Sequence, residues 1–239
     1  MCGRATLTAP REQIEEIAEL LGVSPVELGP PKYNVAPTQP MLVVRERRDH
    51  RREMAFVRWG LIPHWAKAED AKRLSSRQFQ ARLETAPRAP AFRDAFRAHR
   101  CLVIVDGFYE WQTVGGGERV PHHVRRPDGA PFAIGGLWAS WKSPDGEWLD
   151  SCAVLTTKAI TPVAELHDRM PLVLPRSAYE AWLTGSPASA ADVATPSAEL
   201  VAIPVSKWVN DVKHDDPRCI EPVGPVRPPD AIARTAPNR

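Results

Sequence analysis

The stretch that decides the fold is Cys101-Leu102-Val103-Ile104-Val105, which runs directly into Asp106-Gly107-Phe108-Tyr109-Glu110-Trp111. Five consecutive apolar residues, most of them β-branched or aliphatic, predict a strand buried on both faces. Glu110 follows this strand between two aromatic residues. If its carboxyl is buried there, its pKa rises and it can transfer protons near neutral pH. The alternative is a strand whose side chains alternate, with Glu110 facing solvent.

Outward from this strand, short apolar segments and turn signals predict further strands at 41–45, 53–59, 122–126, 131–135, 138–141, 148–156 and 200–205. Helical spacing or capping residues predict short helices at 10–21, from Ser24 onward, at 92–99, from Thr161 to about His167, and at 175–183. This pattern indicates an α+β protein: one compact domain around a strongly curved, mostly antiparallel β-sheet, with short peripheral helices.

Four segments fit neither element. Residues 30–40 are proline-rich and predict an ordered loop or the edge of a sheet, whereas 60–91 lack periodicity and form a long, arginine-rich connection. Residues 188–197 are rich in Ala, Ser and Pro and indicate a variable insertion, and 223–239 indicate a disordered, proline-rich tail. The domain is therefore expected to span 2–222.

Composition narrows the function classes. The 239 residues are 43% hydrophobic and 25% charged with a net charge of +2, which excludes a uniformly basic coat but not a local basic cleft. The four cysteines contain no C-x-x-C pair, so the sequence suggests neither a zinc site nor a disulfide framework, and no metal or organic cofactor is expected. Without a long apolar run or a signal-peptide pattern, we expect a cytoplasmic protein. We also expect a monomer.

The chain opens with Met1-Cys2-Gly3-Arg4. Removal of Met1 would leave Cys2 with a free amine and a thiol on neighbouring carbons, and both titrate at about 8 to 8.5 in simple compounds. Such a 1,2-aminothiol captures an aldehyde twice, first as an imine and then as a five-membered thiazolidine. Its sulfur could instead attack an amide carbonyl with the amine as base. The alternative is a cysteine that merely follows the start codon.

Two further polar residues are candidates for chemistry. His167 begins a polar turn, His167-Asp168-Arg169, where it could move protons or sit as a cation at a helix carboxyl end. Asn34 lies in the proline-bounded segment, where its amide could brace backbone or orient a substrate.

Arginine and aromatic residues also alternate through the first half of the chain. Such a mixture suits single-stranded nucleic acid, since phosphates meet charge and bases stack on rings. The alternative is a solvated loop over core tryptophans. The residues concerned are Arg4, Arg58, Lys67, Lys72, Arg73, Arg77 and Arg82, with Trp59, Trp65 and Phe79 between them.

Six ordered blocks resemble the SOS-response-associated peptidase (SRAP) family: MCGR at 1–4, YNVAPT at 33–38, RWGLIPHWAK at 58–67, ARLET at 81–85, DGFYEW at 106–111 and HDRMP at 167–171. The resemblance runs from residue 2 to about 222 and implies the family's compact, β-rich α+β fold. It also implies a role in the DNA damage response and DNA repair. Family members bind single-stranded DNA at abasic sites and crosslink to the ring-opened sugar as a thiazolidine, which shields the lesion.

The resemblance further implies residue roles. Cys2 would be the nucleophile, Glu110 would move protons on the sugar oxygens, and His167 would assist ring opening and govern reversal. Arg4 and Arg82 would hold phosphates, whereas Trp65 and residues 34–38 would shape the cleft. The family also looks like a self-processing peptidase that removes its own first residue, and strand cleavage through the imine, a lyase outcome, could compete with ring closure.

One position departs from the family pattern. Where the family has Asn before the ARLET block, this chain has Gln80, which keeps the amide but adds a methylene. Gln80 is thus a candidate sugar contact, and we expect slower crosslinking than with Asn. Two other functions stay open: a cysteine peptidase acting on other proteins through Cys2, and a non-covalent module for single strands, which would tolerate Cys2→Ala. Partners would be abasic single-stranded DNA and the replication machinery, with the protein on the nucleoid while it is engaged.

Overall fold

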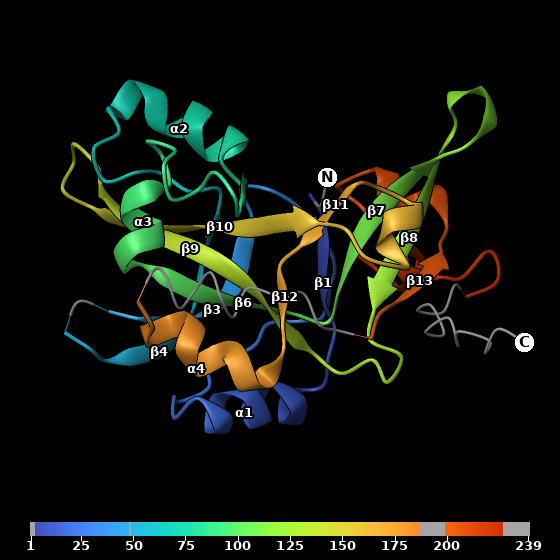
Figure 1. The fold of residues 1–239 in the computed structure, drawn as a ribbon, viewed down its shortest axis with the longest axis horizontal. Helices are drawn as coiled ribbons and strands as arrows, with labels where there is room; N and C mark the ends of the chain where they lie inside the picture. Colours follow the sequence, from blue (N-terminus) through green and yellow to red (C-terminus); the bar gives the residue numbers. More distant parts are fainter. Residues whose placement is uncertain (1–2, 48, 187–198, 227–239) are drawn as a thin grey trace, which may run out of the picture.

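The structure, a computed structural model, describes residues 3–47, 49–186 and 199–226. Its larger sheet closes on itself (Figure 1). Strands β3 (Pro40–Glu46), β4 (Arg52–Trp59), β6 (Arg100–Val105), β9 (Phe132–Lys142) and β10 (Trp148–Lys158) pair in the ring order β4-β3-β6-β9-β10. All contacts in the ring are antiparallel except β10 with β4, where Ser151 pairs with Arg58 in parallel. The sheet is therefore a small barrel, as curved as the sequence predicted.

The predicted central strand is β6, whose six residues are all buried. On one face of the ring, Leu42 and Leu102 belong to a cluster with Ile14 of α1 (Arg11–Leu20) and Trp182 of α4 (Tyr179–Thr184). The other face contributes to a second cluster, which includes Val103 together with Phe108 of the neighbouring sheet. Burying both faces explains why this strand is a continuous apolar run.

A second sheet has the order β13-β8-β7-β1-β2. Its strands are β1 (Ala5–Leu7), β2 (Lys32–Val35), β7 (Gly107–Thr113), β8 (Arg119–Arg125) and β13 (Val201–Pro204). Because β7 follows β6 directly after Asp106, the chain crosses from the barrel into this sheet at that residue. Figure 1 shows the β7–β8 hairpin standing at one end of the molecule, away from α2 and α3.

The carboxyl end of β10 carries two short strands, one on each edge. Thr156 pairs with Arg82 of β5 (Gln80–Arg82) on one side and with Pro171 of β11 (Arg169–Pro171) on the other. The two-residue strand β12 (Val173–Leu174) then pairs with β9. Segments far apart in sequence, the ARLET and HDRMP blocks, thus meet at one end of one strand.

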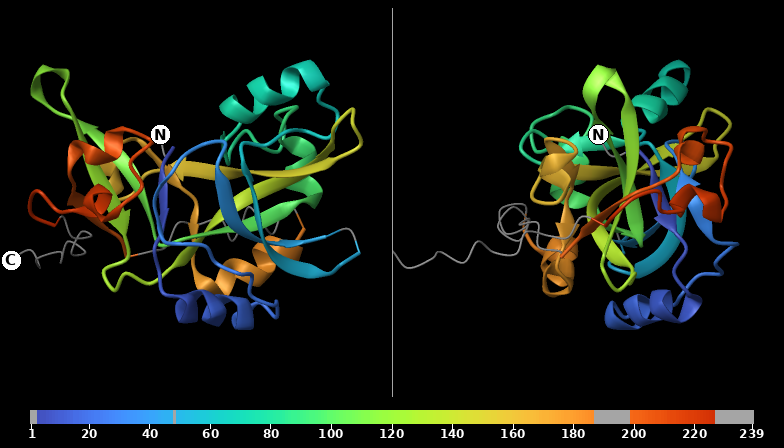
Figure 2. Two further views of the ribbon diagram at one scale, coloured as in Figure 1. Left: turned by 180° about the vertical axis from the view of Figure 1, so that it is seen from behind. Right: turned by 90° about the vertical axis from the view of Figure 1, so that its right-hand side faces the viewer.

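The helices lie at the periphery. Figure 2 shows α1 and α4 on one side of the barrel and α2 (Ala68–Arg77) on the opposite side, with α3 (Arg93–Ala98) at the barrel end. No helix in the described part of the chain is long and apolar enough to cross a membrane.

The α+β fold is confirmed, but four local predictions are wrong. The helix expected from Ser24 is absent from described residues 24–29, because Gly29-Pro30-Pro31 stops it before a turn can nucleate. The segment from Thr161 forms only a 3-10 turn, η2 (Val163–Glu165). The strands expected at 131–135 and 138–141 are one strand, β9, and the irregular stretch 60–91 contains α2. The predicted insertion at 188–197 and the tail beyond residue 226 lie outside the described residues.

Candidate active site

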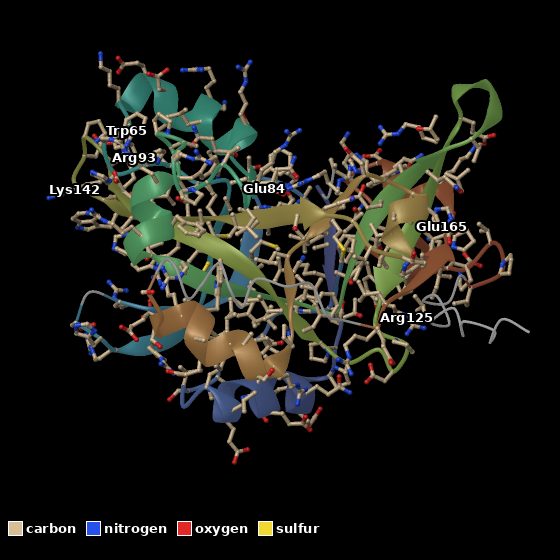
Figure 3. All side chains as sticks on the ribbon, in the orientation of Figure 1. Trp65, Glu84, Arg93, Arg125, Lys142 and Glu165 are labelled. Atoms are coloured by element: carbon tan, nitrogen blue, oxygen red, sulfur yellow. The ribbon has the colours of Figure 1, made fainter. Side chains whose placement is uncertain are left out.

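The candidate site lies where the carboxyl end of β10 faces strand β7 of the second sheet. A hydrogen bond fixes this approach: Gln112 on β7 donates from Nε2 to the Glu165 carbonyl oxygen in η2, at 3.2 Å. On the other flank of β10, Glu84 makes two charge-assisted hydrogen bonds to Arg169, at 2.8 and 2.9 Å. Figure 3 shows Glu84 above β10 and Glu165 beside the second sheet. The turn holding His167 is therefore anchored on both sides.

Glu110 lies in the buried part of β7. Its neighbours Phe108 and Tyr109 are fully buried, and Glu110 itself is 0% exposed, so the alternative of a solvent-facing carboxylate is wrong. Burial raises the pKa of Glu110 from 4.5 to about 7; the positive charge of Arg119 opposes this rise and the negative charge of Asp168 adds to it. A carboxyl group that titrates near neutral pH can both give and take a proton.

His167 is held in a single orientation by its own turn. Its Nδ1 accepts a hydrogen bond from the Arg169 backbone N–H at 2.9 Å, and Asp168 Oδ1 lies 2.8 Å from the same nitrogen. Burial lowers the pKa of His167 below its usual 6.5, so the ring is neutral at pH 7. Of the two roles that the sequence left open for His167, a neutral ring favours proton transfer over a cation at a helix carboxyl end.

Arg4 and Asn34 form one unit. Asn34 is 1% exposed, and its Nδ2 lies within hydrogen-bond distance of the carbonyl oxygens of Val209, Asp211 and His214, at 3.1, 3.0 and 2.7 Å. Its Oδ1 accepts from Arg4 at 2.8 Å, and Arg4 also donates to the Val209 carbonyl at 2.8 Å. Asn34 therefore braces backbone, one of the two roles the sequence left open, and it fixes the Arg4 guanidinium.

Strand β1, which Arg4 directly precedes, is itself tethered by Asp106. The buried Asp106 carboxylate accepts from the Thr6 hydroxyl, from the Thr8 hydroxyl at 2.8 Å, and from the Thr8 and Ala9 backbone N–H groups. Nε2 of His123 lies 3.1 Å from the Thr6 hydroxyl, and burial lowers the pKa of His123 to about 3, so this ring stays neutral. Sequence reasoning singled out Glu110 in the DGFYEW block and missed this role of Asp106.

The remaining predicted residues fall into two groups. Gln80 and the exposed Arg82 lie on β5, next to the carboxyl end of β10, so the structure brings them to the His167 turn. Trp65 is 51% exposed but lies at the opposite end of the barrel from Glu165 (Figure 3), so the fold does not bring it to the site. Cys2 lies outside the described residues.

A pocket of about 370 Å³ opens beside the start of β1. The residues lining it are Gly3, Arg4, Trp111, Arg119 and Asn210. The guanidinium carbons of Arg4 and Arg119 lie 5.9 and 5.8 Å from the centre of the Trp111 ring, a cation–π arrangement. Sequence reasoning missed Arg119. The sequence feature that could have found it is the glycine turn at 115–117, which predicts a hairpin. The register of that hairpin pairs Arg119 with Thr113 and makes Arg119 a diagonal neighbour of Trp111.

The structure has a curved α+β domain, a buried carboxyl, a neutral histidine, and arginines beside the amino-terminal strand. These features agree with the class of protein that the six sequence blocks indicated. The chain belongs to the SOS response associated peptidase (SRAP) family, whose profile matches residues 1–212. The predicted family and its fold are thereby confirmed.

Relatives with assigned names share nearly the whole chain. It is 33% identical over 226 residues to the abasic site processing protein YoqW of Bacillus subtilis, covering 92% of this chain and 99% of the relative. It is 30% identical over 234 residues to the abasic site processing protein YedK of Escherichia coli, covering 93% and 100%. Among solved structures, a Bordetella bronchiseptica protein is 30% identical with a TM-score of 0.74, covering 86% of this chain and 100% of that one. A Bacteroides thetaiotaomicron protein at 22% identity, with a TM-score of 0.79 and coverage of 92% and 99%, supports the fold alone.

Proposed function

We propose that this chain processes abasic sites in single-stranded DNA and forms a covalent thiazolidine crosslink through Cys2 after removal of Met1. The shielded lesion would then be protected from strand cleavage. The observation that carries the proposal is the fully buried Glu110, with a pKa of about 7, on the strand that pairs with β1. The names of YoqW and YedK support the substrate class.

The chemistry begins with a closed sugar, because an abasic deoxyribose is mainly a cyclic hemiacetal. Opening requires a proton on the ring oxygen and loss of the proton from the hydroxyl at C1, which gives the aldehyde. Glu110, near its pKa at neutral pH, and the neutral His167 are suited to these two transfers. Holding the sugar beside the nucleophile would replace high reagent concentration.

The Cys2 amine then adds to the aldehyde carbon, and the resulting carbinolamine loses water to form an imine. The leaving hydroxyl takes its proton from an acid, for which Glu110 is the candidate. The Cys2 thiolate attacks the imine carbon, the nitrogen takes a proton, and the five-membered ring closes. The net reaction consumes aldehyde, amine and thiol and releases one water.

Binding roles follow from position. Arg4 and the exposed Arg82 would contact phosphates from either side of the site, and Gln80 would face the sugar. Asn34 would act through Arg4, because its amide is fully engaged by backbone and by that guanidinium. Trp65 would contact DNA beyond the lesion, if at all, because it lies at the far end of the barrel.

The family description favours a second activity of the same residue, removal of Met1 by self-cleavage. In this step the Cys2 sulfur would attack the Met1 carbonyl carbon, and the peptide bond would break as the Cys2 nitrogen takes a proton. Water would then hydrolyse the resulting thioester, which releases Met1 and leaves Cys2 with a free amine and thiol for the aldehyde. Strand cleavage from the imine is the side reaction that ring closure prevents. Recruitment to replication and a cytoplasmic, nucleoid-associated location would follow from this role.

The test uses purified protein whose loss of Met1 has been checked by mass spectrometry. It is mixed with single-stranded DNA carrying one abasic site and run on denaturing gels beside Cys2→Ala. A shifted band that survives heating and requires Cys2 is expected. A tetrahydrofuran site, which has no aldehyde, should give no band. Absence of any adduct from fully processed protein would refute the proposal and favour peptide substrates.

A further inference from the structure

Arg119 has a charge that the described residues do not neutralise. The residue is exposed, and among the described residues its guanidinium has no carboxylate at salt-bridge distance. The guanidinium instead lies over the Trp111 ring. Arg126, just beyond the other end of β8, is instead paired with Asp128 at 2.9 Å. An exposed arginine held over an aromatic ring and lacking an acidic partner is placed to receive an anion.

The second guanidinium of the same pocket is built in. Arg4 is half-buried and donates to Asn34 Oδ1 and to the carbonyl oxygens of Val209 and Asn210, at 2.8, 2.8 and 3.3 Å. These three acceptors carry no formal charge, and they hold the guanidinium in place at the pocket. The Trp111 indole is fixed as well, since its Nε1 donates to Asn210 Oδ1 at 2.8 Å.

Building on the proposed function, we propose that Arg119, together with Arg4 and Trp111, binds the phosphate group that neighbours the abasic sugar. The 370 Å³ of the pocket accommodates a phosphate with part of its sugar. Arg119 is assigned as a binding and positioning residue, and Trp111 as the surface that holds its guanidinium.

The strand geometry sets the path of the DNA. Glu110 and Trp111 are consecutive residues of β7, so their side chains leave opposite faces of the sheet. In the described part of the chain, β1 pairs with β7 only at Gly107 and Phe108, and Arg4 adds one bond from the Tyr109 N–H. A nucleotide chain crossing the edge of β7 beyond that point passes from the Glu110 face to the Arg119 pocket. Such a crossing requires a sharp bend at the lesion.

The same contact would couple binding to chemistry. Burial sets the raised pKa of Glu110 and the lowered pKa of His167, and the positive charge of Arg119 lowers both. A phosphate bound at Arg119 neutralises that charge, so both pKa values rise when DNA arrives. Glu110 then holds its proton more tightly when the substrate that needs an acid is present.

The test compares three single variants: Arg119→Gln, Arg119→Lys and the control Arg176→Gln. Arg176 is exposed on the side of the molecule near Glu16 and Glu19, away from the pocket. In a Cys2→Ala background, which cannot crosslink, non-covalent binding to single-stranded DNA is measured between 50 and 300 mM salt. The logarithm of the affinity falls as the logarithm of the salt concentration rises. Arg119→Gln should make this fall less steep by about 0.7, the value for one phosphate contact on a single strand, whereas Arg176→Gln should leave it unchanged.

With Cys2 present, the pH profile of the crosslinking rate is a readout that a merely structural role would not move. In Arg119→Gln, the part of the rate-against-pH curve that reports the titration of Glu110 should move to higher pH, because a positive charge that lowers the pKa of Glu110 is gone. Arg119→Lys keeps that charge, so its curve should stay near the wild-type position. An unchanged salt slope or an unchanged pH profile in Arg119→Gln, or the same salt effect in Arg176→Gln, would overturn the assignment. Failure of the wild-type protein to crosslink would instead count against the proposed function, and the salt slopes would still decide the phosphate contact.

Discussion

Replacing Glu110 by Gln should make the stability of the protein less dependent on pH. Burial places the pKa of Glu110 at about 7, against 4.5 in water. Below pH 4.5 the folded and unfolded chains both carry this proton. Between 4.5 and 7 only the folded chain does, so raising the pH through this window favours the unfolded chain, which releases the proton. Because burial raises the pKa from 4.5 to about 7, and each pH unit in that window costs about 1.4 kcal/mol, the free energy of unfolding falls by about 3 kcal/mol by pH 8.

Gln has the shape of a protonated glutamic acid but cannot ionise, so it should abolish this loss. The assay is urea unfolding of both proteins at pH 4, 5, 6, 7 and 8, followed by tryptophan fluorescence. Other titrating groups are common to both proteins and cancel in the difference. The free energy of unfolding of wild type minus that of Glu110→Gln should fall by about 3 kcal/mol from pH 4 to pH 8. A difference that stays constant across this range would refute the burial argument, whatever the protein does with DNA.

Three further predictions concern other parts of the fold. Gln80→Asn should raise the crosslinking rate on abasic single-stranded DNA in single-turnover gels, because it restores the family's shorter amide; an unchanged rate would remove Gln80 from the sugar contacts. Asn34→Ala removes the brace of residues 209–214 and of Arg4, so the urea midpoint should fall by an amount equivalent to about 3 kcal/mol, and DNA affinity should fall with it. Gly60→Ala should destabilise the protein by about 3 kcal/mol or more, since Gly60 has φ +136° and a Cβ there would lie 2.0 Å from the Ser75 carbonyl oxygen. Gly29→Ala, where a Cβ meets nothing within 4 Å, is the matched control, and equal losses in the two variants would contradict the steric argument.

Local patterns in the sequence predicted the elements that bury one whole face, such as an amphipathic helix, or both faces, such as a central strand. The amphipathic helix α1 and the apolar strand β6 are both found where the pattern indicated. Helix α2 was missed because its buried residues are Ala71 and Ser75, too small and too few to mark a period. Strand β9 was divided in two at Gly135 and Gly136, which sequence reasoning took for a break. They are glycines because a Cβ would lie 2.8 Å from Leu172 and 2.7 Å from Val103.

Closure of the barrel could not be predicted, because it depends on the parallel contact of β10 with β4, between residues about ninety apart. For the site, the position of Glu110 after an apolar strand left a buried and a solvent-facing carboxyl both open, whereas the six blocks indicated the family. The neutral state of His167 depends on its packing, and the role of Asn34 on carbonyl groups of residues 209–214. The residues next to His167 and Asn34 in the sequence do not determine these environments, so they could not be predicted from local patterns.

The position of β1 inside its sheet sets when the site can exist during synthesis. β1 leaves the ribosome first, yet its partners are β2 at 32–35, then β7 at 107–113, together with the Asp106 carboxylate. The turn holding His167 arrives some sixty residues later still. β1 therefore lacks its second strand partner until nearly half of the chain is made, and the site lacks His167 until more than two thirds is made. A nascent or truncated chain ending before that turn would carry Cys2 and Glu110 but not His167, so the covalent capture of DNA proposed above would need a chain made at least through that turn.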